Sequence, residues 1–473
     1  MRLGCTPVSE RPRFAPPAEA LEIADRLETR GFQAWAVGGA IRDELLGHAR
    51  EDWDLATDAR PDEVRRVFPR TIPVGIEHGT VGVLGETGTM FEITTFRRDI
   101  ETDGRHAVVE YADSIDEDLA RRDFTINAMA WRPANGQFLD PWEGRADLER
   151  RILRAVGDPA QRVAEDYLRV LRGLRFAGRF QLTIDSDTLA ALQGGVDGTA
   201  TLSAERVRQE LEKVLASRLP SASLALYARL GVLEIWYPEL AEAREEAAWE
   251  QNLAAVDEID ADRADGRLLR LARLLLTPFV AADPLDAGED AEAAGDVRAE
   301  VGHAVLLRLR FSNADVRAVS HLLRHYQPLV SPIDSAARTR EWLSVVDADP
   351  ARQLFELHLA YARAADDEET TRLLEHTLKR VEDELLAGPP LSVTDLAIGG
   401  GDLLALGVKQ GPVVGLLLDE LHARVLEDPE LNDPDVLTRM ATELIEVGSL
   451  GEDRPLDDPS VDGREQAGGE GAE

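Results

Sequence analysis

The sequence predicts an α+β protein in which an N-terminal α/β domain precedes a long all-α remainder. Up to about residue 140, segments typical of strands alternate with amphipathic segments typical of helices. From residue 144 onward, helical periodicity dominates almost to the end of the chain. At 473 residues the chain is too long for one compact core, so about two to four domains are expected.

Apolar spacing and glycines define the elements of the N-terminal domain. Amphipathic helices are predicted over 18–31 and 40–47, closed by Gly31 and Gly47, because glycine readily adopts the conformation that ends helices. Short strands are expected over 34–39, 52–57 and 90–96. The last of these forms a hairpin with the glycine-containing segment before it. Charged motifs therefore lie at strand ends.

Two segments interrupt the helical remainder. Residues 284–300, PLDAGEDAEAAGDVRAE, are acidic and rich in alanine and glycine, which predicts a loop or insertion. Residues 451–473 have almost no apolar content, so they are predicted to be disordered.

The chain is strongly acidic, with a formal net charge of −36. Phosphate contacts need cations, so this charge by itself argues against nucleic acid as a partner. Lys213, Lys379 and Lys409 are the only lysines. An acidic surface poor in lysine favours a halophilic protein, in which concentrated salt screens the self-repulsion. Coding bias toward arginine and acidic residues is the alternative.

The composition also excludes several classes of protein. No apolar run approaches the length of a membrane span, and the N-terminus lacks the apolar core of a signal peptide. Cys5 is the only cysteine, which excludes disulfides within the chain and cysteine-based zinc sites. A cytoplasmic protein is expected.

Asp52 and Asp54 form the first candidate site. Side chains two apart on a strand share a face, so these carboxylates project together while Trp53 points into the core. Adjacent carboxylates repel unless a cation lies between them, and Mg²⁺ accepts such ligands together with substrate phosphates. The alternative is a solvated surface strand. Gly38 and Gly39 allow a ligand to approach the backbone closely.

Several segments occur in a particular order along the chain. They are GGAIRD…EDWDLAT (38–57), TIPVGIEHGTVGV (71–83), FEITTFR (91–97), DEDLARRDFTINAMAW (116–131), the segment over 140–180, LSAERVRQELEKVL (202–215) and GGDLLALGVKQGPVVGLLLDEL (400–421). In this order they resemble the motifs of class II tRNA nucleotidyltransferases and their bacterial poly(A) polymerase relatives. The likeness is dense over 38–215 and thin over 220–390.

The resemblance implies a nucleotidyltransferase α/β head followed by all-α neck, body and tail domains. The implied boundaries are 18–141 for the catalytic head, 142–220 for the neck with a nucleotide-selecting helix, 221–330 for the helical body, 331–450 for an RNA-binding body and tail, and 451–473 for a disordered acidic tail.

The resemblance also implies roles in the head. Arg42 follows the glycine turn. Glu92 could be a third catalytic carboxylate near the metals, or an ordinary surface glutamate. Arg122 meets the triphosphate, since a guanidinium grips phosphate oxygens in pairs. Asp123 and Asn127 lie near the ribose, where Asp123 is alternatively a helix cap.

In the neck, Asp166 and Arg169 are predicted to share one helical face and to read the base. The carboxylate accepts a hydrogen bond from the exocyclic amine of cytosine or adenine, and the arginine donates to the adjacent ring nitrogen. Uracil and guanine offer the wrong groups. A surface ion pair is the alternative. Arg172 and Arg175 extend a locally cationic arginine run toward phosphates.

The implied activity is template-independent addition of CCA to the 3′ end of tRNA, with Mg²⁺ as cofactor. The implied partners are tRNA, CTP and ATP, with neither a membrane nor DNA. Alternatives within the family are CC addition, A addition or poly(A) synthesis, and the alternative outside it is a non-catalytic RNA-binding protein.

A loop over 97–112 favours the full CCA activity. The turn over 406–412, with Lys409, contacts RNA or is an ordinary helix hairpin. Thr277 and Pro278 stand where some relatives carry a His–Asp pair, so no phosphatase activity is expected.

Overall fold

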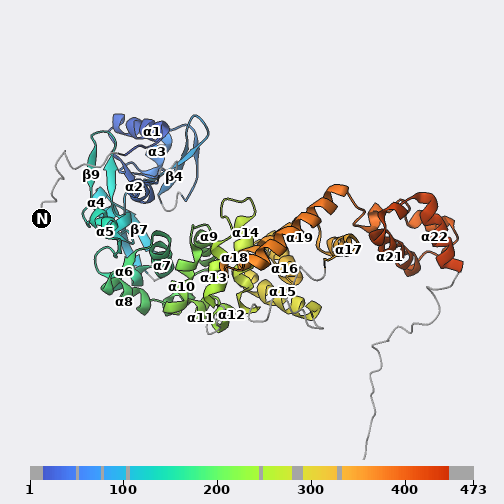
Figure 1. The fold of residues 1–473 in the computed structure, drawn as a ribbon. Helices are drawn as coiled ribbons and strands as arrows, with labels where there is room; N and C mark the ends of the chain where they lie inside the picture. The colour runs from blue at the N-terminus through green and yellow to red at the C-terminus, as the bar shows by residue number, and fades with distance from the viewer. Residues whose placement is uncertain are drawn as a thin grey trace, which may run out of the picture. The chain divides into compact units, whose positions relative to one another are not determined.

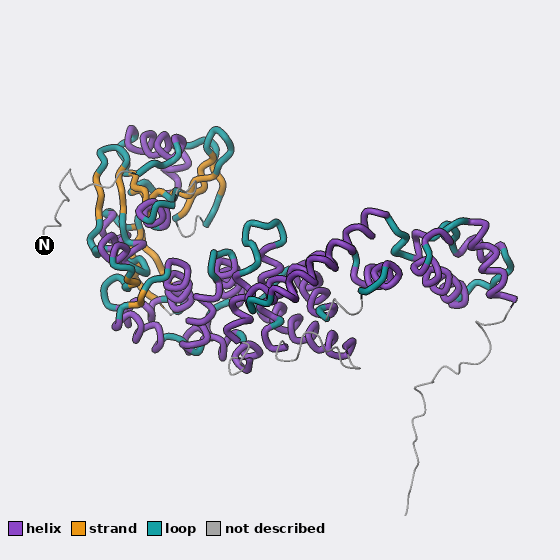
Figure 2. The backbone as a smooth tube through the Cα atoms, in the orientation of Figure 1, coloured by secondary structure: helices purple, strands orange, loops and turns teal. Residues whose placement is uncertain are grey.

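The structure is a computed structural model that describes residues 14–48, 53–75, 79–102, 107–243, 249–279, 291–327 and 333–446. It confirms the predicted fold class. Strands lie almost entirely in the N-terminal part, and the rest of the described chain is helical (Figure 2). None of the helices in these stretches combines the length and the apolar character that a membrane span needs.

The head is built on a seven-stranded mixed sheet with strand order β3-β4-β5-β2-β1-β8-β9. Its strands are β1 (Ala34–Val37), β2 (Leu55–Thr57), β3 (Thr71–Ile72), β4 (Thr80–Leu84), β5 (Met90–Thr95), β8 (Ala130–Arg132) and β9 (Gln137–Leu139). Within this sheet β2 and β5 pair in parallel, and the other neighbours are antiparallel. The predicted hairpin is the β4–β5 pair.

Five helices accompany the sheet: α1 (Ala18–Thr29), α2 (Gly39–Leu45), α3 (Pro61–Val67), α4 (Ile115–Ala120) and α5 (Gly144–Glu149) (Figure 1). The first two confirm the predicted helices, and Gly31 and Gly47 end them with φ of 92° and 80°. Apolar side chains of β1, β2, β8 and α4 form one buried core with Phe96. Trp53 is fully buried, as predicted.

Residues 97–112 were predicted as a loop, and this prediction is wrong. Residues 103–106 lie outside the described residues, and on either side of them the strands β6 (Arg97–Thr102) and β7 (Ala107–Tyr111) pair antiparallel. Arg98 and Glu110 stand opposite each other and form an ion pair of 2.7 Å. Opposite charges across a strand pair favour pairing, and the segment Ala107–Tyr111 is rich in residues that prefer strands.

The remainder is helical apart from the short parallel pair β10 (Ile152–Leu153) and β11 (Thr183–Ile184). Its helices up to α14 are α6 (Pro159–Glu165), α7 (Leu168–Phe180), α8 (Ser186–Gly194), α9 (Ala204–Leu215), α10 (Pro220–Leu230), α11 (Val232–Trp236), α12 (Pro238–Glu242), α13 (Trp249–Asp257) and α14 (Gly266–Leu275). Those that follow are α15 (Ala291–Arg308), α16 (Asn313–His325), α17 (Ala336–Val346), α18 (Ala348–Ala364), α19 (Glu368–Ala387), α20 (Gly400–Ala405), α21 (Pro412–Glu427) and α22 (Pro434–Glu446). The chain divides into two compact units, and residues up to Gln327 together with Glu356–Thr371 form the first.

The predicted loop over 284–300 is wrong where it can be compared. Residues 284–290 lie outside the described residues, but 291–300 form the first part of α15. Alanine favours helix, and Gly295 lies against α16, where a Cβ atom would come within 2.3 Å of the Arg324 carbonyl oxygen. The glycine that suggested a loop therefore serves close helix packing.

The second unit holds the predicted turn between helices. Leu406–Gly411 link α20 to α21, which confirms the helix-turn-helix over 400–421. Apolar side chains of α20, α21 and α22 form the core beneath it, and Lys409 is exposed. The tail over 451–473 lies outside the described residues.

Candidate functional site

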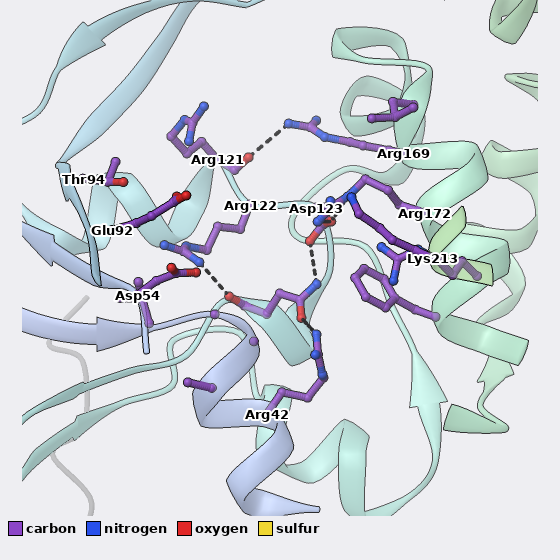
Figure 3. Close-up of a pocket in the computed structure, with 18 of the residues that line it drawn as sticks. Arg42, Asp54, Glu92, Thr94, Arg121, Arg122, Asp123, Arg169, Arg172 and Lys213 are labelled. Atoms are coloured by element: carbon purple, nitrogen blue, oxygen red, sulfur yellow. Dashed lines mark hydrogen bonds and ion pairs between the residues drawn. The ribbon is translucent and has the colours of Figure 1, made fainter. Parts of the chain in front are cut away.

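A cavity of about 640 Å³ brings the candidate residues of the head and the neck together (Figure 3). Ten basic and five acidic side chains line it, so it is cationic in a chain of net charge −36. The candidate residues that line it are Gly38, Gly39, Arg42, Asp54, Glu92, Arg122, Asp123, Asn127, Asp166, Arg169, Arg172 and Arg175. Asp52, the remaining one, lies outside the described residues.

The edge of the head sheet supplies the carboxylates. Asp54 directly precedes β2, and its carbonyl oxygen accepts a hydrogen bond of 3.2 Å from the Val37 N–H. The parallel register pairs Leu55 with Ile93, so Asp54 lies beside Glu92 of the neighbouring strand. Figure 3 shows both carboxylates on the sheet side of the cavity, opposite Arg169, Arg172 and Lys213. The prediction that Asp52 and Asp54 share a face remains untested.

Both the backbone conformation and the closeness of Arg122 require a glycine at position 38. Its φ of 70° lies in the left-handed region, which side chains disfavour. A Cβ atom there would also lie 2.8 Å from Arg122 Nη1. The glycine therefore lets Arg122 pass close to the backbone at the start of α2.

Asp54 and Glu92 offer carboxylate oxygens, the ligand type that Mg²⁺ prefers. Within the described part of the chain, no group of three or more histidine, cysteine, aspartate or glutamate side chains is placed to hold a metal. Mg²⁺ commonly takes one or two carboxylates and completes its coordination with water and substrate phosphates. The side chains present therefore fit such an ion when a triphosphate supplies further ligands.

A hydrogen-bonded chain connects α2 to α7 through the segment after α4. Arg42 Nη1 donates to Asn127 Oδ1 at 2.5 Å, and Asn127 Nδ2 donates to Asp123 Oδ1 at 2.9 Å. Arg172 Nε donates to Asp123 Oδ2 at 2.7 Å. Burial alone would raise the pKa of Asp123, but Arg172 and Asn127 outweigh it and hold that pKa well below its usual range. Asp123 is not a helix cap, since Phe124 occupies that position in the short helix that follows.

Arg122 lies nearer the head carboxylates. Its Nη2 forms an ion pair of 2.9 Å with Asp118, one turn earlier in the chain, and its Nη1 donates to the Asn127 carbonyl oxygen at 3.3 Å. The Arg122 side chain keeps 21% of its surface exposed, so it remains accessible to an anion in the cavity.

The prediction that Asp166 and Arg169 lie on one helix is wrong, although both line the cavity. Helix α6 ends at Glu165, and Asp166 has an extended backbone with φ of −157°. Its Oδ1 accepts a hydrogen bond of 3.0 Å from the Leu168 N–H, so the side chain competes with the helix ladder and separates α6 from α7. Its Oδ2 accepts a hydrogen bond from Arg206 at 2.7 Å.

Arg169 and Arg175 of α7 have carboxylate partners. Arg169 pairs with Glu165 at 2.6 Å and donates to the Arg121 carbonyl oxygen at 3.1 Å. Arg175 pairs with Glu210 of α9 at 2.6 Å, and both side chains are almost fully buried. The Arg175–Glu210 pair therefore fixes α7 against α9 behind the cavity.

Replacing Glu210 with alanine should lower the free energy of unfolding by about 3–5 kcal/mol, because Arg175 would remain buried without its counter-charge. Lys213→Ala is the matched control, since its side chain is 51% exposed and pairs with the same glutamate, so its loss should cost under about 1 kcal/mol. Urea unfolding measures both. Equal small losses in the two variants would contradict a structural role for the buried pair.

Sequence reasoning overlooked Arg206 and Asp118, the partners of Asp166 and Arg122. Arg206 lies on α9 and lines the cavity itself. One signal was available for each in the spacing: Asp118 precedes Arg122 by four residues, and Arg206 precedes Lys213 by seven.

Residues 34–154 match the family described as "Poly A polymerase head domain", and residues 181–244 match "Probable RNA and SrmB- binding site of polymerase A". The fold and the cavity thus define a nucleotidyltransferase. A CCA-adding enzyme of Leuconostoc mesenteroides subsp. mesenteroides is 32% identical over 432 residues, which cover 90% of this chain and 96% of that protein. The chain belongs to the CCA-adding enzyme family of tRNA nucleotidyltransferases.

Solved structures agree. The crystal structure of Bacillus stearothermophilus CCA-adding enzyme in complex with CTP matches with a TM-score of 0.71 and 28% identity, over 91% of this chain and 98% of that one. Thermotoga maritima CCA-adding enzyme, complexed with tRNA, shares the fold with a TM-score of 0.57 and 20% identity, over 90% of this chain and 94% of that one.

Proposed function

We propose that this chain adds CTP, CTP and ATP in turn to the 3′ end of tRNA without a nucleic-acid template and releases pyrophosphate. One observation carries the proposal: a single cationic cavity combines carboxylates at a sheet edge with Asp166 and Arg169 on the helical side. The carboxylates suit a metal-bound triphosphate, and the helical side presents an acceptor and a donor suited to a base edge. The named relatives support the same activity.

Each side chain has a role in this proposal. Arg122 binds triphosphate oxygens beside the Gly38–Gly39 turn, and Arg42 holds Asn127 in place through their hydrogen bond. Asp123 and Asn127 meet the ribose hydroxyls. Asp166 accepts a hydrogen bond from the amine of cytosine or adenine, and Arg169 donates to the ring nitrogen. Arg172 and Arg175 add positive charge behind these groups.

The cofactor in this proposal is Mg²⁺, which Asp54 would hold together with Asp52 and the triphosphate. When bound, it would lower the energy of the attacking oxygen and of the leaving pyrophosphate. The protein side chains orient the triphosphate and the base and balance charge, and no side chain needs to act as an acid or a base. Most of the rate enhancement would come from positioning.

The remaining assignments complete the proposal. The head, neck and body follow the boundaries 18–141, 142–220 and 221–330, and residues 331–450 bind RNA, with Lys409 contacting the backbone. The protein acts in the cytoplasm.

A tRNA trimmed of its 3′ end, incubated with each nucleotide separately and in mixtures, tests the proposed activity. Sequenced products should end in CCA only when CTP and ATP are both present. Products that end in CC, in a single A or in a run of A would assign the corresponding alternative activity. No extension under any condition would support an RNA-binding protein without catalysis.

Activity and folding should both improve in molar KCl if the net charge of −36 reflects a salt-rich cytoplasm. Salt screens the acidic self-repulsion, whereas it also weakens contacts with RNA phosphates. Circular dichroism and nucleotide addition, followed across a KCl series, measure both effects. Full folding and highest activity in dilute buffer, with inhibition by KCl, would refute the adaptation.

A further inference from the structure

One buried arginine in the body differs from the others. Six arginines are buried in the described part of the chain: Arg42, Arg169, Arg175, Arg270, Arg273 and Arg340. Four of them form an ion pair with a carboxylate. Arg270 lacks one but donates to three carbonyl oxygens, those of Ile259, Leu215 and Ser217. Arg273, one turn further along α14, has neither arrangement.

Arg273 has no exposed surface, and its Nη2 donates a hydrogen bond to Asn252 Oδ1, while the Tyr326 hydroxyl lies within reach of the same guanidinium. Among the residues that the structure describes, its Nε and Nη1 have no hydrogen-bond partner. The guanidinium carbon lies 4.7 Å from the centre of the Tyr361 ring and 5.9 Å from that of Tyr326. Aromatic faces attract a cation but do not accept these N–H groups as a carboxylate would.

Polar atoms near Arg273 are also poorly satisfied. Within the described part of the chain, Thr277 Oγ1, the Tyr326 hydroxyl and His358 Nε2 are buried and have no well-formed hydrogen bond. The Tyr326 and His358 rings stack with their centres 4.1 Å apart, and Thr277 follows Arg273 by four residues. Burial, reinforced by the Arg273 charge, lowers the pKa of His358 to about 3, so this imidazole is neutral at neutral pH. Among the described residues, three polar atoms of neighbouring side chains, together with two nitrogens of Arg273 itself, thus lack a well-formed hydrogen bond.

Within the described residues, no ion pair with a carboxylate compensates this charge. Arg298 also lies near Tyr326 and His358, and within the described residues neither Arg273 nor Arg298 forms an ion pair. Burial raises the pKa of Tyr326, so a tyrosinate does not supply the missing negative charge. Buried charges in proteins are otherwise paired, because an isolated ion in a low-dielectric interior is very unfavourable.

We propose that the body binds a small monovalent anion, chloride, between the guanidinium of Arg273 and the hydroxyl groups of Thr277 and Tyr326. The surrounding groups are donors, which suits an anion and excludes a metal cation. Their nearly complete burial favours a monatomic ion over a phosphate ester, whose oxygens would need more donors and an opening to solvent. The inference does not depend on the proposed function.

Thermal unfolding of the full chain in potassium chloride and in potassium gluconate of equal ionic strength tests the site. Gluconate is too large to enter a closed cluster. Chloride should raise the unfolding midpoint of the wild type by about 5 °C in a saturable manner, as expected for a ligand that binds only the folded state. Arg273→Met should lose this increment.

Arg270→Met is the matched control, because Arg270 is equally buried on the same helix but is satisfied by carbonyl oxygens. It should lower the midpoint in both salts and retain the chloride increment. A chloride increment that persists in Arg273→Met, or that disappears equally in Arg270→Met, would overturn the proposal.

Two further measurements apply if Arg273→Met fails to fold. Thr277→Val removes one donor, so chloride affinity from the same titration should fall about tenfold. An unchanged affinity would contradict the site. Crystals grown with bromide should show an anomalous scattering peak beside Arg273, and water alone at that position would refute the assignment.

Discussion

Asp54→Ala should abolish nucleotide addition, with kcat/KM for CTP falling about a thousandfold or more. The carboxylate stands at the sheet edge beside Glu92 and lines the cavity. Loss of a metal ligand removes several kcal/mol of transition-state stabilisation, and each ~1.4 kcal/mol is a factor of ten in rate. Because the residue is exposed, folding should be unaffected, and the urea midpoint measures this.

Asp62→Ala provides the control, since it removes an exposed carboxylate on α3 that pairs only loosely with Arg65, at 3.8 Å. It should leave addition unchanged. Glu92→Gln, measured in parallel, decides whether Glu92 belongs to the catalytic set: a loss close to that of Asp54→Ala would include it. Near-normal turnover in Asp54→Ala would refute the metal site.

Asp166→Ala should weaken base selection more than catalysis. The carboxylate would accept the amine hydrogen of cytosine and would face the carbonyl of uracil unfavourably. Loss of this hydrogen bond should reduce the free-energy difference between CTP and UTP by roughly 1–3 kcal/mol. The ratio of kcat/KM for CTP to that for UTP should therefore fall about tenfold to a hundredfold. Slow addition should persist, because Arg122 and Asp54 are unchanged.

A second variant, Arg206→Ala, tests whether Arg206 positions the Asp166 carboxylate. Arg206 holds Asp166 Oδ2 at 2.7 Å, so its loss should free the carboxylate without removing it and reduce the CTP-to-UTP ratio less. All four nucleotides are compared on trimmed tRNA. Full CTP preference in Asp166→Ala would show that the base is selected elsewhere.

Local sequence rules predicted the elements that local physics determines. Gly31 and Gly47 end α1 and α2 where expected, and the alternation at 90–96 gave β5. The cavity-lining residues were predictable because the motif order was available, not because any one of them carried a clear signal. The buried position of Trp53 followed from strand alternation alone.

The errors arose where contacts between residues distant in sequence, or competing local hydrogen bonds, determine the structure. Asp166 interrupts the helix because its side chain takes the Leu168 N–H, which helical periodicity does not reveal. The Arg175–Glu210 pair spans 35 residues and the Asp166–Arg206 pair spans 40, so spacing could not predict either. In α15 the glycine meets the backbone at Arg324, a contact visible only after folding.

Because the cavity arginines already form ion pairs, nucleotide binding has to replace existing contacts. Arg122, Arg169 and Arg172 each hold a protein carboxylate before any nucleotide arrives. An incoming phosphate or base therefore substitutes one acceptor for another rather than ordering a free side chain. Such an exchange gains little enthalpy per arginine but requires little conformational entropy. When pyrophosphate leaves, each arginine can re-form its ion pair with the protein carboxylate. This exchange favours rapid release of pyrophosphate between successive additions.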